Sequence, residues 1–336
     1  MLLNLVHHLQ KNPQVKKIYV FCQKNYYPSE EKTVFLPQSP AGGITKILAL
    51  LNSHIVVRGG GTCFFDPPNL SGLNNLRRII TLSKLLGKKY VFLGVGVGRI
   101  KQEWLKNLTC QLLGQADAVN FRDPYSARWA KINCVLRNIS VGGDLVFADL
   151  NWYPKKPCSS SPKIISFTAS NYLSPPSLVR QVGKSLAKVV QQLGAKIKFL
   201  PACLYEDMDQ KIHRRLARFL PKGGFLYTSW KKPEDFLTEL RESDFHIGAR
   251  LHSLILADII GVPAFSVSPA KKVVFYLRKT KFFGKRHFPK GNFNGNVIQQ
   301  FFENYGSFEK QRLDFIQKEH QRALKSLRVL DKIISS

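Results

Sequence analysis

The chain has 336 residues, of which 44% are hydrophobic and 22% charged, so it is neither disordered nor fibrous and is long enough for two domains. Its 51 Lys and Arg against 22 Asp and Glu give a formal net charge of +29, which must attract polyanions. No run reaches the roughly 18 apolar residues of a membrane-spanning helix, and the apolar patch at the start is too short for a signal peptide.

Short β-branched runs alternate with helical patterns in the first half of the chain, as in βαβ units with a mainly parallel sheet. The predicted strands cover 17–21, 54–57, 90–95, 117–121 and 139–141. Apolar residues at helical spacing predict helices over 71–86, 102–113 and 124–131. This pattern predicts one doubly wound α/β domain.

A Pro, Ser and Lys cluster at 154–163 has the composition of a linker, and the alternation resumes after it. The predicted strands of the second half are 163–167, 196–200, 225–227, 244–247 and 264–267. The predicted helices are 176–193, 208–220, 233–241 and 251–260. We therefore expect a second α/β domain.

An amphipathic helix is predicted over 306–334, where apolar residues form one stripe opposite Lys, Arg and Glu. The expected organisation is a first domain at 1–155, a second at 156–305 and this C-terminal helix at 306–336. Two α/β domains joined by a linker suggest a ligand cleft between them.

The six cysteines are far apart, with no C-x-x-C motif and no Cys/His cluster. This spacing argues against a zinc site and against a disulfide framework, so we expect a reducing cytoplasm.

The basic residues are densest at 271–290, where no acid occurs between Asp258 and Glu303. Such a segment is either a solvated face or a surface that binds an anionic membrane or an anionic substrate. The net charge keeps nucleic acid open as a partner, but no aromatic-studded basic sheet is predicted, which disfavours it.

The strongest candidate site is the run "DFHIGARLHSLILADIIGVPAFSVS" at 244–268. It places Arg250 and His252 where a strand joins the N-terminus of a helix, and unpaired N–H groups and the helix dipole favour an anion there. Arg250 would bind that anion with its guanidinium, and His252 would donate a proton. The alternative is a surface arginine and a core histidine.

Two glycine-rich loops follow strands in the first half, at Gly59–Gly61 and around Gly96. Either they allow a ligand close to the backbone or they serve tight packing, and a nicotinamide-binding fingerprint is only partly present. Arg122 and Asp123 end a further strand and either face the cleft or form an internal ion pair. No G-x-S-x-G elbow, H-E-x-x-H or Walker loop occurs, which disfavours hydrolase, zincin and P-loop functions.

Several of these pieces resemble the polysaccharide pyruvyl transferase family. The segment 244–273 resembles its C-terminal signature, an RLH core followed by an apolar helix, GVP, a strand and a closing Lys-Val. The glycines at 59–61, "RDPYS" at 122–126 and "GGDLVFA" at 142–148 follow in the family's order. The resemblance covers about residues 54 to 275.

The resemblance implies two Rossmann-like domains in a GT-B-like arrangement. It also implies phosphoenolpyruvate as donor, a sugar diol of a cell-surface or lipid-linked saccharide as acceptor, and no metal or cofactor. His252 and Arg250 are then the predicted catalytic residues. The predicted substrate contacts are Arg250, Leu251, Ser253, Lys272, Gly59, Gly60, Gly61, Gly96 and Arg122. The expected location is the cytoplasm or the inner face of the membrane.

The chain departs from the family pattern in three places. The loop at 21–32 has no glycine, 166–171 has no arginine, and the acid expected before the closing lysine is absent. Two other functions therefore stay open: a GT-B glycosyltransferase that uses a nucleotide sugar, and a catalytically lapsed basic protein that binds anionic polymers or membranes.

Overall fold

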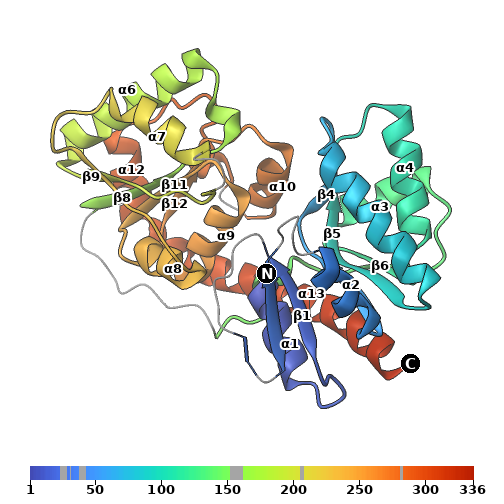
Figure 1. Cartoon of the computed structure of the whole chain (residues 1–336). Helices are drawn as coiled ribbons and strands as arrows, with labels where there is room; N and C mark the ends of the chain where they lie inside the picture. Colours follow the sequence, from blue (N-terminus) through green and yellow to red (C-terminus); the bar gives the residue numbers. More distant parts are fainter. Residues whose placement is uncertain (23–28, 31, 38–42, 152–161, 205–207, 281–282) are drawn as a thin grey trace. The chain divides into compact units, whose positions relative to one another are not determined.

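The structure, a computed structural model, describes residues 1–336 except 23–28, 31, 38–42, 152–161, 205–207 and 281–282. The chain divides into two compact units (Figure 1), Met1–Asp149 with Gln317–Ser336, and Leu150–Ile316. The predicted domain boundary at residue 155 lies outside the described residues. The C-terminal helix α13 (Glu309–Ser335), predicted as a segment of its own, begins in the second unit and ends in the first.

The first unit contains a parallel sheet in the order β3-β5-β6-β7, with β4 also paired to β5, and a separate parallel pair β1-β2. Its elements are α1 (Leu2–Lys11), β1 (Ile18–Cys22), β2 (Thr33–Pro37), α2 (Gly43–Leu51), β3 (Ile55–Gly59), β4 (Thr62–Phe64), α3 (Leu70–Leu85), β5 (Lys89–Val97), α4 (Glu103–Gly114), β6 (Ala118–Phe121), α5 (Pro124–Asn133) and β7 (Ile139–Val141).

Helices α3, α4 and α5 share one hydrophobic core with the sheet of the first unit, built around buried residues such as Ile80, Phe92 and Leu112. The C-terminal part of α13 packs against the loop after β7. There the Ser326 hydroxyl lies 3.1 Å from the Gly143 nitrogen, and a side chain at position 143 would meet the α13 backbone at Ala323 at 2.6 Å. Glycine is thus required where the helix crosses this loop.

The second unit is a five-stranded parallel sheet in the order β10-β9-β8-β11-β12. Its elements are β8 (Ile164–Thr168), α6 (Pro176–Leu193), β9 (Lys196–Phe199), α7 (Met208–Ala217), β10 (Phe225–Tyr227), α8 (Pro233–Arg241), β11 (Phe245–Gly248), α9 (Leu251–Ile260), β12 (Ala264–Ser266), α10 (Lys271–Lys279), α11 (Phe283–Arg286) and α12 (Gly295–Glu303).

The central strands of the second unit are buried on both faces, as expected for a parallel sheet covered by helices. Phe167 and Phe245 belong to the core that α6, α7 and α12 complete. Because side chains alternate along a strand, Ser166 and His246 point to the opposite face, where α9 packs. One face of the sheet is thus apolar and the other carries buried polar groups.

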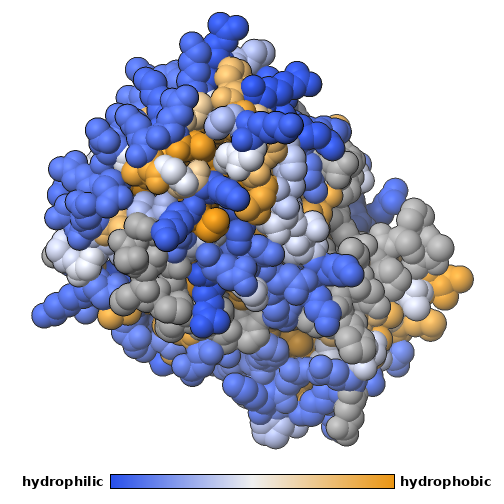
Figure 2. Space-filling view, turned by 90° about the vertical axis from the view of Figure 1, so that its left-hand side faces the viewer, coloured by the Kyte–Doolittle hydropathy of each residue, from blue (hydrophilic) through white to orange (hydrophobic). Residues whose placement is uncertain are grey.

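The predicted α/β class is confirmed, and each predicted strand and helix overlaps an observed one. The sequence analysis missed shorter elements, including α1, β2, α2 and α10. Within the described residues, no helix combines the length and the apolar content needed to cross a membrane. Hydrophilic side chains cover most of the face shown in Figure 2, with smaller hydrophobic areas between them.

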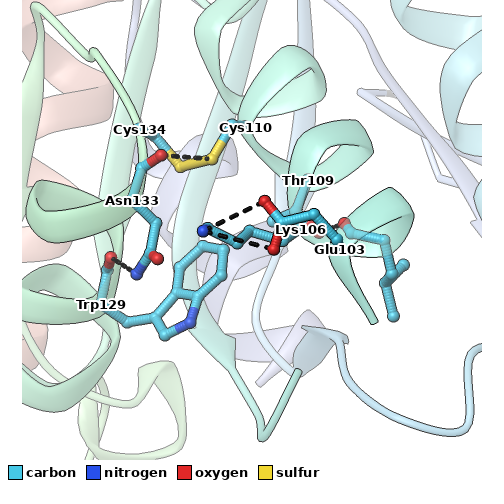
Figure 3. Close-up of a disulfide and its surroundings, with 8 residues drawn as sticks. Glu103, Lys106, Thr109, Cys110, Trp129, Asn133 and Cys134 are labelled. Atoms are coloured by element: carbon cyan, nitrogen blue, oxygen red, sulfur yellow. Dashed lines mark hydrogen bonds and ion pairs between the residues drawn. A yellow bond between two sulfur atoms is a disulfide. The ribbon is translucent and has the colours of Figure 1, made fainter. Parts of the chain in front are cut away.

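A disulfide joins Cys110 of α4 to Cys134, the residue after α5, with their Cα atoms 5.0 Å apart (Figure 3). The expectation of no disulfide is therefore wrong, because helix packing brings together two cysteines that are 24 positions apart in sequence. The inference of a reducing compartment loses the support of the cysteine spacing. Cys22, Cys63 and Cys203 are free thiols.

Replacing both bridged cysteines by serine should lower the free energy of unfolding by about 3 kcal/mol, because the bridge closes a loop of roughly 25 residues in the unfolded chain. Denaturant titration under non-reducing conditions measures this change. Cys63→Ser, which removes a half-buried free thiol, is the matched control. Quantitative alkylation of Cys110 and Cys134 in the unreduced native protein would contradict the bridge.

Candidate functional site

The candidate site lies at the carboxyl ends of β8 and β11, where the strand order of the second unit reverses. From β8 the chain proceeds to β9 on one side, and from β11 it proceeds to β12 on the other. In open α/β sheets, ligands bind in the crevice outside the carboxyl ends at such a switch point. Ala169 and Ser170 follow β8 and Arg250 follows β11, so the predicted strand-to-helix join lies at this position.

Close packing at Gly248 sets the sharp turn from β11 into α9. A Cβ at this position would lie 2.8 Å from both the His246 Nε2 and the Ser253 Oγ atoms, so only glycine fits. The Ala249 nitrogen donates to the Thr168 carbonyl at 3.0 Å, and Arg250 is the N-cap residue with an extended backbone. The Arg250 side chain does not cap the helix, so the positive end of the α9 dipole has no side-chain acceptor from its own N-cap.

Arg250 is held by the buried carboxylate of Asp209 on α7. Its Nε donates to Asp209 Oδ2 at 3.0 Å, its Nη2 donates to Asp209 Oδ1 at 2.5 Å, and its Nε also lies 3.1 Å from the Ala169 carbonyl oxygen. Asp209 is completely buried, and its Oδ2 accepts two further bonds from the Ala202 and Cys203 nitrogens at 2.9 Å. The carboxylate is thereby fully satisfied and fixes the guanidinium.

The fixed guanidinium keeps donors for a ligand. A guanidinium has five N–H groups, and Asp209 and Ala169 use those of Nε and part of Nη2. Within the described part of the chain, the Arg250 Nη1 atom has no hydrogen-bond partner, and the side chain is 29% exposed. The edge formed by Nη1 and Nη2 can bind a carboxylate or phosphate with two parallel hydrogen bonds.

Two buried polar atoms next to this pair have no partner among the described residues: the His213 Nε2 atom and the Ser170 hydroxyl. His213 is one turn from Asp209 on α7, and its ring stacks on Phe199 at 4.9 Å between centroids. Burial, with the nearby charge of Arg250, lowers the pKa of His213 to about 3, so the ring is neutral. Buried polar atoms of this kind normally find a partner, so they mark a place where a polar ligand or water would bind.

Beneath α9, a buried network joins the strands to the helix. His246 lies 2.9 Å from the Ser166 hydroxyl and 3.0 Å from the Ser253 hydroxyl, which in turn lies 2.8 Å from that of Thr168. Burial lowers the pKa of His246 to about 3, so this ring is neutral too and can accept a hydrogen bond. The network fixes the first turn of α9.

The predicted residues around the RLH motif have different surroundings. His252 is half-buried in the first turn of α9, and Leu251 is buried. Ser253, predicted as a substrate contact, is instead buried with its hydroxyl in the network under the helix. Lys272 is exposed in the first turn of α10, which follows β12 at the same carboxyl edge of the sheet as Arg250.

The predicted residues of the first unit gather around Arg122. This guanidinium donates to Thr62 Oγ1 at 3.0 Å and to Asp144 Oδ2 at 3.3 Å, and a Cβ at Gly96 would lie 2.9 Å from its Nε. The turn at Gly59–Gly61 that precedes Thr62 has positive φ at Gly60 and Gly61. Arg122 is 9% exposed, so the internal ion pair, left open as an alternative, accounts for its bonds.

The sequence analysis missed Asp209, His213 and Ser170. Asp209 and His213 are four positions apart on the predicted helix 208–220, and that spacing was the available signal. Outside the gaps in the described chain, no group of three or more His, Cys, Asp or Glu side chains could hold a metal ion.

A family model for polysaccharide pyruvyl transferases matches residues 1–270, which is most of the chain. The chain belongs to the polysaccharide pyruvyl transferase family. The resemblance found in the sequence is thus confirmed. A search of curated proteins found no match to this family member.

The fold of this pyruvyl transferase family member is similar to that of solved enzymes of the GT-B type. A putative UDP-N-acetylglucosamine 2-epimerase from Listeria monocytogenes has a TM-score of 0.64 at 14% identity, over 99% of this chain and 91% of the epimerase. The S. aureus MnaA–UDP structure has a TM-score of 0.61 at 13% identity, over 98% and 91% of the two chains. The UDP-GlcNAc 2-epimerase from Neisseria meningitidis, bound to UDP-GlcNAc, has a TM-score of 0.58 at 11% identity, over 99% and 95%. These similarities confirm the GT-B-like fold class.

The two neutral buried histidines should make the stability of this pyruvyl transferase family member pH-dependent. Below about pH 6.5 the unfolded chain gains one proton per histidine, whereas the folded chain does not until about pH 3. The free energy of unfolding should therefore fall as the pH falls through this range. His246→Gln should reduce that slope by about 1.4 kcal/mol per pH unit.

Denaturant titrations between pH 4 and 6 measure this slope, and the exposed His54→Gln variant is the control. Equal slopes for His246→Gln and wild type would show that His246 is protonated in the folded protein.

Proposed function

We propose that the chain transfers the pyruvyl group of phosphoenolpyruvate to a sugar diol of a cell-surface or lipid-linked saccharide, forming a cyclic ketal and releasing phosphate. Family membership supports the transferase class. The observation that carries the donor assignment is Arg250, fixed by Asp209 at the strand-order switch with one edge of its guanidinium available. No metal or cofactor takes part in this proposal.

The donor fits the site by charge and size. Phosphoenolpyruvate is a compact anion with a phosphate and a carboxylate, and each can accept two parallel hydrogen bonds from the Nη1–Nη2 edge of Arg250. The N-terminal end of α9 favours the same charge. Lys272 at the start of α10 adds a positive charge at the same sheet edge. The unpartnered atoms of Ser170 and His213 supply further polar partners.

The proposed chemistry begins with protonation. His252, as imidazolium, gives a proton to the methylene carbon of phosphoenolpyruvate, which becomes a methyl group, and the adjacent carbon becomes oxocarbenium-like. One sugar hydroxyl adds to that carbon, the C–O bond to phosphate breaks, and the second hydroxyl closes the ketal. The two hydroxyl protons return one to His252 and one to the departing phosphate, so the reaction balances. Arg250 would stabilise the phosphate as it leaves.

A nucleotide sugar is the second candidate donor. Fold neighbours of this chain were solved with UDP and with UDP-GlcNAc, and a strand-order switch also suits a nucleotide. In that case the chain would be a glycosyltransferase of the same fold class. The third candidate, a basic protein that binds without catalysis, rests on the net charge and on the departures from the family pattern.

The proposed acceptor fits an enzyme that works in the cytoplasm, where phosphoenolpyruvate is available, or on the inner face of the membrane. The acceptor would be a free or lipid-linked saccharide. Nucleic acid is not part of the proposal.

Phosphoenolpyruvate should bind the wild-type chain in calorimetry. Arg250→Lys should weaken this binding by about 10- to 100-fold, because lysine keeps the charge but loses the paired hydrogen bonds. His252→Gln should leave the affinity within a few-fold and reduce ketal formation by about 10²-fold or more. Phosphate release and mass spectrometry of a glycan acceptor measure the reaction.

Arg214→Lys is the matched control, since Arg214 is an exposed arginine on α7. Binding of UDP-GlcNAc with none of phosphoenolpyruvate would favour the glycosyltransferase. Full turnover by both Arg250→Lys and His252→Gln would remove the site assignment, and no binding of either donor would favour the lapsed binding protein.

A further inference from the structure

The short helix α2 turns its apolar residues toward solvent. Ile44, Ile47, Leu48 and Leu51 have the i, i+3, i+4, i+7 spacing that normally faces a core, yet their exposed fractions are 74%, 53%, 51% and 47%. Ala49 is the buried residue of this helix. Four large aliphatic side chains in one exposed stripe differ from the scattered single residues that are normal on a surface.

The end of α3 extends this stripe. Leu82, Leu85 and Leu86 are 42%, 77% and 39% exposed. Strands β3 and β5, which follow α2 and α3, are parallel neighbours, so both helices end at the same edge of the sheet. The Lys88 ammonium donates to the Leu51 carbonyl at 2.9 Å, which ties the two helix ends together, and Figure 1 shows the helices next to one another. We call these seven apolar side chains the α2–α3 face.

The surroundings of the α2–α3 face are strongly basic. Residues 43–89 contain seven Lys and Arg and a single acid, Asp66. Arg77 and Arg78 are exposed on α3. Lys84 is paired with Asp117 at 2.7 Å, so one acid from outside the segment offsets one of these charges. The remaining charge is positive.

We propose that the α2–α3 face docks onto the surface of an anionic lipid bilayer. Aliphatic side chains on a short helix, flanked by Lys and Arg, are the combination that enters the boundary between headgroups and acyl chains. The charge selects this partner over a second copy of the chain, because two such basic faces would repel each other. The absence of aromatic residues from the face also differs from the aromatic and arginine anchors of protein interfaces.

This surface lies wholly in the first unit, apart from Arg250 and from the basic segment 271–290 of the second unit. The proposal is therefore independent of the donor and of catalysis. It would hold the chain where a lipid-linked acceptor is found.

Vesicle flotation of the full chain tests the proposal, using phosphatidylcholine vesicles with and without phosphatidylglycerol. The triple variant Ile47→Gln, Leu48→Gln, Leu85→Gln removes apolar surface but changes no charge. The control is Ile132→Gln with Val135→Gln, two residues of the first unit that are 70% and 99% exposed. The triple variant should bind phosphatidylglycerol vesicles at least about tenfold more weakly than wild type, and the control should bind like wild type.

Equal binding by wild type and the triple variant would overturn the proposal, since binding would then rest on net charge alone. Absence of wild-type binding would overturn it as well. Light scattering of the same proteins adds a further readout: a wild-type dimer that the triple variant converts to a monomer would assign the face to a second copy instead. Unchanged thermal unfolding of all variants shows that the substitutions leave the fold intact.

Discussion

The Asp209 carboxylate is completely buried, and its charge is balanced by Arg250 and by two backbone N–H groups at 2.9 Å. A buried carboxylate without its partner would cost about 3–5 kcal/mol, so this pair ties α7 to the start of α9. The same contact orients the guanidinium and leaves its Nη1–Nη2 edge for an anion. Stability and ligand binding in the second unit thus depend on one interaction.

The two units use buried Arg–Asp contacts differently. Arg122 is 9% exposed and bonded to Thr62 and Asp144, so its donors serve the packing of three loops in the first unit. Arg250 is 29% exposed and retains donors. Beneath it, the neutral His246 and its hydroxyl partners hold the first turn of α9 without placing a second buried charge there. This difference explains why the anion site is assigned to the second unit.

The strand-to-helix join at 244–260 was predictable because local signals agree: an apolar run, Gly248 where the chain must turn, and Gly261 with positive φ after the helix. Local pattern does not contain the pairing of Arg250 with Asp209, which is 41 positions away, or the bridge between Cys110 and Cys134. The missed helix α2 is nine residues long and its apolar stripe faces solvent, so periodicity indicates the helix but not its environment.

A crystal structure of the chain with phosphoenolpyruvate tests the central claim most directly. The account predicts electron density for the ligand at the carboxyl ends of β8 and β11, with its phosphate or carboxylate on the Nη1–Nη2 edge of Arg250 while Asp209 keeps the opposite edge. Ligand density elsewhere, with the Arg250 edge bound to another part of the protein, would contradict it.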